Sequence, residues 1–447
     1  MSALPNATII VLNWNGRSYL EACLSALFSQ THQAQRIVLV DNGSTDDSLA
    51  LVRRQFPAVD IIENEINLGY AGGNNVALRQ LETEVAILVN PDIVVRHDWL
   101  ENLLVAFRQD AAIGIAGCKL LYPGEQQLQH AGGLISHPRA MPEHRGMYGM
   151  DEGQWDSVAD VDFVTGAAFA IRREVIETAG LLDEGFFMYF EDADWCVRAR
   201  RFGFRVVYVP QATAVHDESA IAVRGSPSYL RHFHSGRWRY LLKHFEAEEI
   251  VEETLPVEMA WLEEIEGDER RALGWAYRDT LSDLPEIMAS RVAHGAAEIA
   301  HSDQAKIRTS LLEMRQAAML WVDNPAMWQE LKEAGQVDPQ PFPTTTPLLG
   351  PLFARLRTLW AGVAVKPYVG ALNEQQNDFN QSFAKELQAI EERLREFEGV
   401  WMKQEGEQRE MAWELEALQW ELIRTHHLLA SIESRLQKRE AKQGTDS

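Results

Sequence analysis

The sequence contains few cysteines, and it lacks a long apolar run. Cys23, Cys118 and Cys196 form no close pair and follow no metal-site spacing. Isolated cysteines of this kind are typical of reduced thiols in a cytosolic protein rather than of a disulfide framework. No apolar run reaches the roughly 18 residues that a membrane span requires. The sequence therefore predicts no disulfide scaffold and no membrane-spanning helix.

Positive charge is scarce as well. The chain of 447 residues has 42 Lys and Arg against 66 Asp and Glu, which gives a formal net charge of -24. Nucleic-acid binding needs a basic face, so we expect no nucleic-acid partner. The N-terminus shows no secretory leader, which agrees with a cytoplasmic location. Residues 352–372 are apolar but interrupted by charges and proline, so we expect peripheral contact with the inner face of a membrane at most.

Two phosphate-binding motifs are absent. The sequence has no GxxxxGK[ST] motif, and its glycine-rich stretch NLGYAGGNN at 67–75 does not have the GxGxxG spacing. Their absence disfavours a P-loop NTPase and a Rossmann dehydrogenase. The 67–75 loop still allows a ligand to approach the backbone closely, because its glycines carry no side chain.

Short apolar runs alternate with helical patterns through the first 210 residues. Strands are expected at 8–12, 36–40, 59–63, 85–89, 111–117, 162–171 and 205–209, the last ended by Pro210. This alternation predicts an α/β fold with a mostly parallel sheet. Residues 121–160 are irregular and rich in Gly, Pro and His, so we expect a long insertion or lid there.

The expected strand at 85–89 stops at Asn90-Pro91-Asp92. Proline cannot continue a strand ladder, so Asp92 should lie at the carboxyl edge of the sheet. Open α/β sheets bind ligands at this edge, and a carboxylate there suits a divalent cation that holds a diphosphate. The alternative is that Asp92 starts a turn and caps the helix near Trp99.

Three other acidic residues, at two places in the chain, are expected at the same edge. Asp41 ends the strand at 36–40, where it could bind a base or ribose or serve as an Asx-turn residue. Glu191 and Asp192 lie at the start of a helix predicted at 192–202, and repulsion between these neighbours could raise the pKa of a catalytic base. The alternative for Asp192 is a helix-capping role.

Five segments, in order, resemble glycosyltransferase family 2: VLNWNG, VDNGSTDDS, NLGYAGGNN, NPD and FFMYFEDADWCVRARRFGFRVVYVP. The likeness covers about residues 6–245 and is greatest to the bacterial rhamnosyltransferase-like branch. It implies a GT-A fold, a nucleotide-diphosphate sugar donor, a divalent metal (Mg²⁺ or Mn²⁺) and inversion at the anomeric carbon. It also implies a glycan or glycolipid acceptor.

The resemblance assigns roles to single positions. Asn90 replaces the first acid of the family's Asp-x-Asp motif, so Asp92 must carry most of the metal contact. Asp41 matches the base-recognition acid, Asp192 the general base, and His216 the late histidine of the metal shell. Glu191 and Gly166 fall on the acceptor side. The remaining positions expected to bind the donor nucleotide are Asn13, Asn67, Gly69 and Asn74.

Several charged or polar residues near these motifs are expected to be structural. Asp194 should interact with the helix dipole. Arg198, Arg200 and Arg201 should form a solvated helix face, with phosphate contact as the alternative. His130, His137 and His144 have no metal-site spacing, so we expect them on the surface of the lid.

We expect four regions along the chain. A GT-A domain (1–245) precedes an acidic helical segment (246–337), a stiff proline-rich linker (338–351) and an amphipathic or coiled-coil region (352–447). From Phe383 to Leu436, seam positions recur at alternating steps of three and four residues, which predicts a coiled coil that forms an oligomer. Gln404 and Gln408 are polar seam positions that could set its register.

Two other functions are compatible with parts of this pattern. A coiled-coil assembly protein could carry a non-catalytic sugar-nucleotide-binding domain, although Asp41, Asp92, Asp192 and His216 are all present. A sugar-phosphate nucleotidyltransferase would need a glycine-rich N-terminal loop with a basic residue, which VLNWNGRS supplies poorly.

Overall fold

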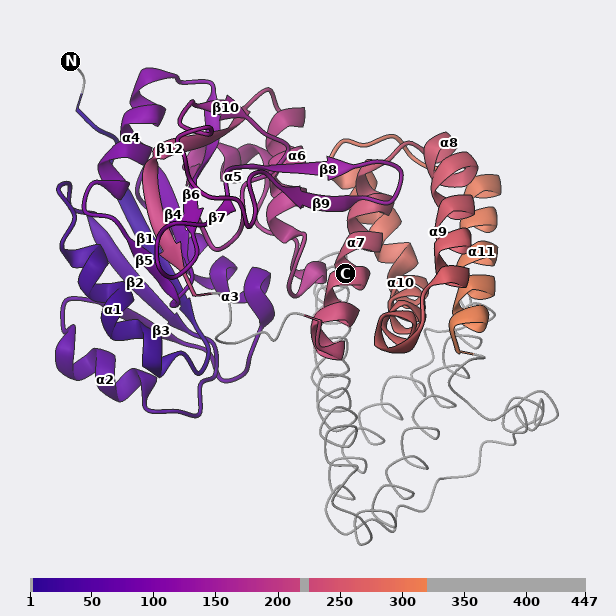
Figure 1. The fold of residues 1–447 in the computed structure, drawn as a ribbon, viewed down its shortest axis with the longest axis horizontal. Helices are drawn as coiled ribbons and strands as arrows, with labels where there is room; N and C mark the ends of the chain where they lie inside the picture. Colours follow the sequence, from indigo (N-terminus) through magenta and orange to yellow (C-terminus); the bar gives the residue numbers. More distant parts are fainter. Residues whose placement is uncertain (1–2, 218–224, 320–447) are drawn as a thin grey trace, which may run out of the picture. The chain divides into compact units, whose positions relative to one another are not determined.

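The computed structural model describes residues 3–217 and 225–319. In this part of the chain, a central sheet is followed by a group of helices (Figure 1). The predicted linker at 338–351 and the predicted coiled coil at 352–447 lie outside the described residues, as does the end of the 246–337 segment. The boundaries of the four regions therefore stay predictions.

The central sheet has the strand order β10-β12-β6-β11-β4-β1-β2-β3, with β5 paired to β12 and β7 paired to β6. Its strands are β1 (Ala7–Asn13), β2 (Arg36–Asp41), β3 (Asp60–Glu63), β4 (Val85–Val89), β5 (Ile93–Val95), β6 (Ile113–Leu121), β7 (Leu128–His130), β10 (Ala159–Asp160), β11 (Ala168–Arg172) and β12 (Arg205–His216). Strands β4, β1, β2 and β3 are parallel, as are β6 and β12, whereas β11 runs antiparallel between β4 and β6. The predicted α/β fold with a mostly parallel sheet is confirmed.

Helices cover both faces of this sheet, because alternate strand residues point to opposite faces. On one face, α1 (Arg17–Phe28), α2 (Ser48–Gln55) and α4 (Trp99–Gln109) pack on a core that includes Ile9 and Ile87. On the other, α3 (Gly69–Leu78), α5 (Arg173–Ala179) and α6 (Glu191–Arg201) pack on a core that includes Ile10 and Leu88. The continuous apolar strands follow from burial on both faces.

Two predicted strands differ from the observed ones. β12 does not stop before Pro210 but continues to His216, and a register shift between Val209 and Thr213 lets the sheet pass the proline. The strand expected at 162–171 begins only at Ala168. The longer β12 brings His216 opposite Ile93 of β5, next to the Asp92 turn.

The expected lid at 121–160 is instead partly regular and anchored. It contains β7, β10 and a hairpin of β8 (Gly133–Ser136) and β9 (Met141–His144). The hairpin tip reaches the helical segment, because Thr254 Oγ1 donates to the Pro138 carbonyl at 2.8 Å. Arg237 Nη1 donates to the Arg139 carbonyl at 2.9 Å. Sequence patterns do not show such anchoring, because the partners are about a hundred residues away.

The helical segment shares a core with the sheet domain. Helix α7 (Pro227–His244) lies just before this segment, which comprises α8 (Ala247–Glu249), the single π-helical turn η2 (Ile250–Thr254), α9 (Leu255–Glu264), α10 (Gly267–Ala293) and α11 (His301–Met319). Buried residues such as Trp238, Tyr277 and Leu311 join the cluster that also contains Ile10 and Trp195. Within the described ranges, none of the helices has the length and apolar character needed to cross a membrane.

Candidate active site

A cavity of about 290 Å³ lies at the carboxyl edge of the central sheet. Of the predicted site residues, Asn67, Gly69, Asp92, Gly166, Glu191, Asp192 and His216 line it. Asn13, Asp41 and Asn74 are buried beside it but do not form its wall. Residues separated by up to 149 positions in the chain thus meet in one place, as expected where parallel strands end together.

Asn13 and Asp41 form a buried pair behind the cavity wall. They are register partners at the ends of β1 and β2, and Asn13 Nδ2 donates to Asp41 Oδ1 at 3.0 Å. The other carboxylate oxygen of Asp41 accepts from the Ser44 backbone N–H at 3.0 Å. The Asp41 carboxylate therefore fixes its own turn, and each of its oxygens has a hydrogen-bond donor.

The 67–75 loop brings backbone close to the cavity at Gly69. This residue has φ +73°, and a Cβ there would lie 2.5 Å from the Phe187 carbonyl oxygen, so only glycine fits. Asn67 Oδ1 accepts from the Gly69 N–H at 2.9 Å and from Asn42 Nδ2 at 2.8 Å. Asn42 also lines the cavity, although sequence reasoning assigned it no role. Asn74 lies in α3, where its Nδ2 donates to the Tyr70 carbonyl at 3.0 Å.

Asp92 and His216 face each other across 3.5 Å, measured from Asp92 Oδ1 to His216 Nε2. His216 Nδ1 lies 2.7 Å from Gln129 Oε1. Because an amide oxygen can only accept, Nδ1 carries the proton, and in the neutral imidazole Nε2 then has the lone pair that faces Asp92. Asp92 Oδ1 is buried and has no hydrogen-bond partner. Two electron-pair donors side by side are the arrangement that a cation would satisfy.

No group of three or more His, Cys, Asp or Glu residues suited to a metal occurs within 3–217 and 225–319. A metal at Asp92 and His216 would therefore take its other ligands from substrate and water. Magnesium sites commonly have this composition, with one or two protein ligands plus phosphate oxygens. The donor set fits a nucleotide-bound cation better than a permanently bound one.

Asp192 is held by the loop that precedes β11. Its Oδ2 accepts from the Gly166 N–H at 2.6 Å, and its Oδ1 accepts from the Ala193 N–H at 2.7 Å. The Gly166 carbonyl accepts from Tyr70 Oη at 2.5 Å. Burial raises the pKa of Asp192 to about 6, although the backbone hydrogen bonds oppose that rise. A carboxylate with this pKa can accept a proton near neutral pH.

Glu191 is buried next to Asp192, and its Oε2 has no hydrogen-bond partner. Burial raises its pKa well above the ordinary value, and the charge of Asp192 raises it further. Burial is thus the main cause of the raised pKa of both residues, and the predicted repulsion adds to it only for Glu191.

Backbone strain surrounds this acidic pair. Phe187, Tyr189 and Phe190 have φ of +52°, +69° and +71°, in the left-handed region that non-glycine residues rarely adopt. Such conformations persist only where surrounding structure enforces them, and they cluster at functional sites. Phe190 immediately precedes α6, so this strained turn sets the direction in which Glu191 and Asp192 leave the backbone.

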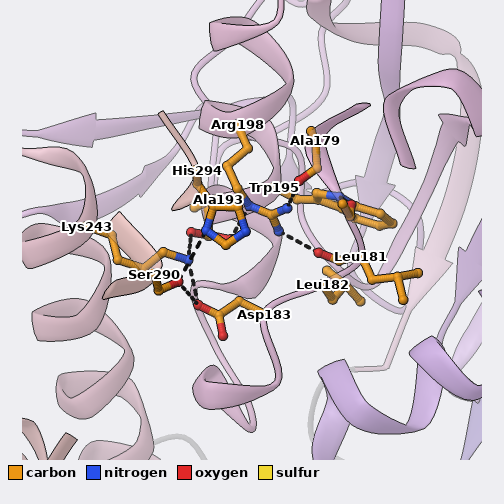
Figure 2. A network of polar contacts seen from close by, with 12 residues as sticks. Ala179, Leu181, Leu182, Asp183, Ala193, Trp195, Arg198, Lys243, Ser290 and His294 are labelled. Atoms are coloured by element: carbon orange, nitrogen blue, oxygen red, sulfur yellow. Dashed lines mark hydrogen bonds and ion pairs between the residues drawn. The ribbon is translucent and has the colours of Figure 1, made fainter. Parts of the chain in front are cut away.

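Two structural expectations for α6 are corrected. Asp194 does more than meet the helix dipole, because it forms a buried ion pair with Arg198, with 2.8 Å between Arg198 Nε and Asp194 Oδ2. Arg198 is fully buried rather than solvated, and its guanidinium also donates to the carbonyls of Ala179 and Leu181 (Figure 2). Arg200 is half-buried and Arg201 exposed. A buried guanidinium needs several acceptors, and the 179–181 turn provides them.

The prediction for the lid histidines is wrong for two of the three. His130 and His144 line the cavity, and their Nδ1 atoms lie 2.8 Å apart. Burial and the neighbouring His144 lower the pKa of His130 well below its ordinary value. His137 has a largely exposed side chain, as expected. The hairpin brings His144 back beside β7, which the irregular sequence of this region did not indicate.

Several residues that line the cavity were not predicted from the sequence. Tyr70 and Asn42 lie within motifs that were recognised, so their neighbours could have indicated them. Gln129, Tyr229 and Phe233 lie in no motif, and only the fold brings them to the cavity. The last two belong to α7, which packs beside α6 and α10.

Comparisons with known proteins find similarity over the first part of this chain. The family model described as glycosyl transferase family 2 matches residues 8–180. Over 227 residues, the chain is 32% identical to O-antigen biosynthesis protein RfbC of Myxococcus xanthus, covering 48% of this chain and 18% of that one. The chain therefore spans less than a fifth of the length of this relative.

The chain is also similar to a second curated relative and to solved structures. Over 261 residues, the chain is 25% identical to N-acetylglucosaminyl-diphospho-decaprenol L-rhamnosyltransferase of Mycobacterium tuberculosis, covering 52% of this chain and 83% of that one. Among solved structures, GalNAc-T7 with UDP, GalNAc and Mn²⁺ has 15% identity and a TM-score of 0.48, covering 72% of this chain and 58% of that one. Over residues 8–180, this chain is therefore similar to glycosyl transferase family 2.

Proposed function

We propose that the protein is an inverting, metal-dependent glycosyltransferase that moves a sugar from a nucleotide-diphosphate donor to a hydroxyl of a glycan or glycolipid. One observation carries the proposal: the cavity that holds the Asp92–His216 pair also holds Asp192, whose pKa is raised to about 6. A proton acceptor and a cation site in one cavity are the two elements that such a transfer requires.

Asp192 acts as the general base. The acceptor hydroxyl oxygen attacks the anomeric carbon of the donor sugar while Asp192 takes the hydroxyl proton. The bond between that carbon and the diphosphate oxygen breaks, and the diphosphate leaves with the electron pair. Because attack and departure occur on opposite faces, the configuration inverts. The Gly166 N–H orients the carboxylate for this step through its 2.6 Å hydrogen bond.

Asp92 and His216 would hold the metal, which we infer to be Mg²⁺ or Mn²⁺. The fit rests on the buried, unpartnered Asp92 Oδ1 and on the lone pair of His216 Nε2 beside it. When bound, the cation would offset the charge that develops on the diphosphate. Gln129 keeps His216 in the tautomer with a free Nε2. Asn67 and Gly69 would meet the nucleotide at the wall, and Asn13, Asp41 and Asn74 would support it from behind.

The acceptor would enter beside Glu191 and Gly166. Beyond them the cavity wall is mainly apolar and aromatic, with Met188, Tyr189, Tyr229 and Phe233. Apolar faces of this kind suit the C–H face of a sugar ring, because packing removes both surfaces from water. The names of the relatives favour a rhamnosyl donor and a polysaccharide or lipid-linked acceptor. We place the reaction at the cytoplasmic face of a membrane.

A panel of nucleotide sugars tests the proposal. The purified chain is incubated with UDP-, GDP- and dTDP-sugars, with and without Mg²⁺ or Mn²⁺, and release of the nucleoside diphosphate is measured. We expect metal-dependent release from one donor and faster release with a suitable glycan acceptor. Metal-dependent donor binding without any turnover would instead favour a non-catalytic sugar-nucleotide-binding domain.

We also propose that the predicted coiled coil at 352–447 makes the protein an oligomer. Light scattering compares the full chain with one that ends near residue 339. A smaller assembly is expected after truncation, and equal masses would contradict the proposal.

A further inference from the structure

The segment from Asp183 to Asp194 carries the proposed base and is tied to α7 at both ends. Lys243 Nζ lies 2.6 Å from Asp183 Oδ2 and 2.5 Å from Asp194 Oδ1. Lys243 and Asp194 have fully buried side chains, and that of Asp183 is 9% exposed. Figure 2 shows the Lys243 side chain reaching Asp183, with Ser290 beside them. One ammonium group thus joins two positions eleven residues apart.

Helix α7 also lies tightly along the middle of this segment. A Cβ on Gly236 would come within 2.6 Å of the Tyr189 carbonyl oxygen, so a side chain at this position of α7 would push on the strained turn. A Cβ on Gly185 would come within 2.1 Å of the Arg239 guanidinium carbon. Arg239 in turn binds both Asp183 oxygens, at 2.9 and 3.0 Å from Nη2. The segment therefore contacts α7 at its ends and at its centre.

The helical segment holds α7 in this place. Arg239 Nη2 lies 2.7 Å from Glu286 of α10, and Ser290 of α10 donates to Asp183 Oδ2 at 3.3 Å. Arg291, also in α10, donates to the carbonyls of Leu242 at 3.0 Å and Phe245 at 2.7 Å. The buried charges at the contact are mutually satisfied, which makes this contact specific as well as stable.

Left-handed backbone at Phe187, Tyr189 and Phe190 would relax if nothing opposed it. We propose that Lys243 is a positioning residue for Asp192. By joining Asp183 and Asp194 it keeps the strained turn closed, and residues beyond 245 thereby belong to the catalytic unit. The inference rests on the proposed function. It assigns to the helical segment the task of holding the base in the geometry that proton transfer requires.

The main test replaces the ion pair by neutral residues of similar size. The variant K243M with D183N changes no net charge, and Asp194 keeps Arg198 and His244 as partners. We expect kcat for transfer to fall roughly 10- to 100-fold, the effect of an ångström-scale misplacement. The donor KM should stay within about a factor of two, because Asp92 and His216 are untouched. The pH at which turnover is half-maximal on the acid side should not change, since Asp192 remains the base.

The matched control is R237M with E258Q. Arg237 lies on the same helix, and its ion pair with Glu258 is fully buried but contacts α9 instead of the 183–194 segment. It should lower the melting temperature by a similar amount and leave kcat within about twofold. Equal loss of kcat in both double variants would overturn the proposal, because general destabilisation would then explain it.

A second variant covers the case in which the first does not fold. G236A leaves every charge in place and pushes on the Tyr189 carbonyl. It should lower kcat with an unchanged donor KM. Wild-type kcat in a folded G236A variant, or in folded K243M with D183N, overturns the positioning role. Absence of transfer by the wild-type chain overturns the proposed function itself, and the positioning role with it.

Discussion

Four of the five carboxylates between residues 183 and 194 form two contrasting pairs: Asp183 with Asp194, and Glu191 with Asp192. All four lose much of their contact with water, which by itself raises a carboxylate pKa. For Asp183 and Asp194 the cations of Arg239, Arg198 and Lys243 more than reverse this effect, and both pKa values fall below the ordinary range. For Glu191 and Asp192 burial prevails, and both pKa values rise.

The contrast shows that one segment contains acids that stabilise the fold and acids that face the cavity. The flanking acids are neutralised by ion pairs and hold α6 and α7 together. The central acids face the cavity, and the charges that act on Glu191 are those of the Asp192 and Asp194 carboxylates. A group whose pKa lies near the working pH can gain and lose a proton, whereas a tightly paired one cannot. Cation placement thus decides which acids are available for catalysis.

The largest expected effect comes from removing the proton acceptor. D192N should lower transfer turnover by roughly 10²–10⁴-fold, the usual contribution of a general base. Donor affinity should barely change, because Asp92 and His216 are untouched. Turnover is measured at saturating donor and acceptor, with the melting temperature as control. A folded D192N variant with near wild-type turnover would refute Asp192 as the base and direct attention to Glu191.

Removing a paired acid should affect stability first. D194N leaves Arg198 and Lys243 with less compensation, and breaking a buried ion pair in this way costs about 3–5 kcal/mol. Chemical denaturation measures the loss. E191Q is the matched variant in the same helix turn, since it replaces a carboxylate that has no cation partner. Similar stability of D194N and wild type would contradict the division into two pairs.

Loss of the proposed metal ligand should weaken donor binding. D92A is expected to lower the Mn²⁺-dependent affinity for a nucleoside diphosphate by roughly 10- to 100-fold, in the range seen when metal sites lose a supporting group. Calorimetry with and without Mn²⁺ measures it. D98A, which removes an exposed carboxylate six residues away, serves as the control. Unchanged Mn²⁺-dependent affinity in both variants would exclude Asp92 as a ligand.

The raised pKa of Asp192 predicts an acid limb in the transfer rate. Below pH 6 the carboxyl becomes protonated and cannot accept the acceptor proton. The turnover should therefore be half-maximal near pH 6 and fall about tenfold per unit below it. A pH series in the presence of saturating Mn²⁺ and donor gives the profile. A limb near pH 4 would mean that an acid with an ordinary pKa is responsible.

The smallest effect is expected for E191Q at neutral pH. The folded-state pKa of Glu191 is raised, so its contribution favours folding below the unfolded-state pKa and is lost as the pH rises through the folded value. Gln resembles the protonated form, so the melting temperature at pH 7 should change by no more than about 2 °C. The variant should gain relative stability at higher pH. A large loss of stability at pH 7 would indicate that an ionised Glu191 is needed for folding.

The sequence by itself determined the alternating elements and the ends of strands. Asp41 and Asp92 follow apolar runs that end in turn residues, so local pattern and the rule that parallel strands end together were enough to place them. Family likeness named Asp192 and His216, and the structure brings both to the cavity. Whether these residues play the expected roles stays a prediction.

Only the tertiary structure decided which charges are paired. Arg198 looked solvated because its neighbours in sequence are basic, but the 179–181 turn surrounds it. Lys243 carries no motif, and its partners lie 49 and 60 residues away. Burial and pairing depend on side chains from several elements. Which of these side chains lie close together in space cannot be predicted from the periodicity or spacing of the sequence. For the same reason, the raised pKa of Asp192 has burial rather than its neighbour Glu191 as its main cause.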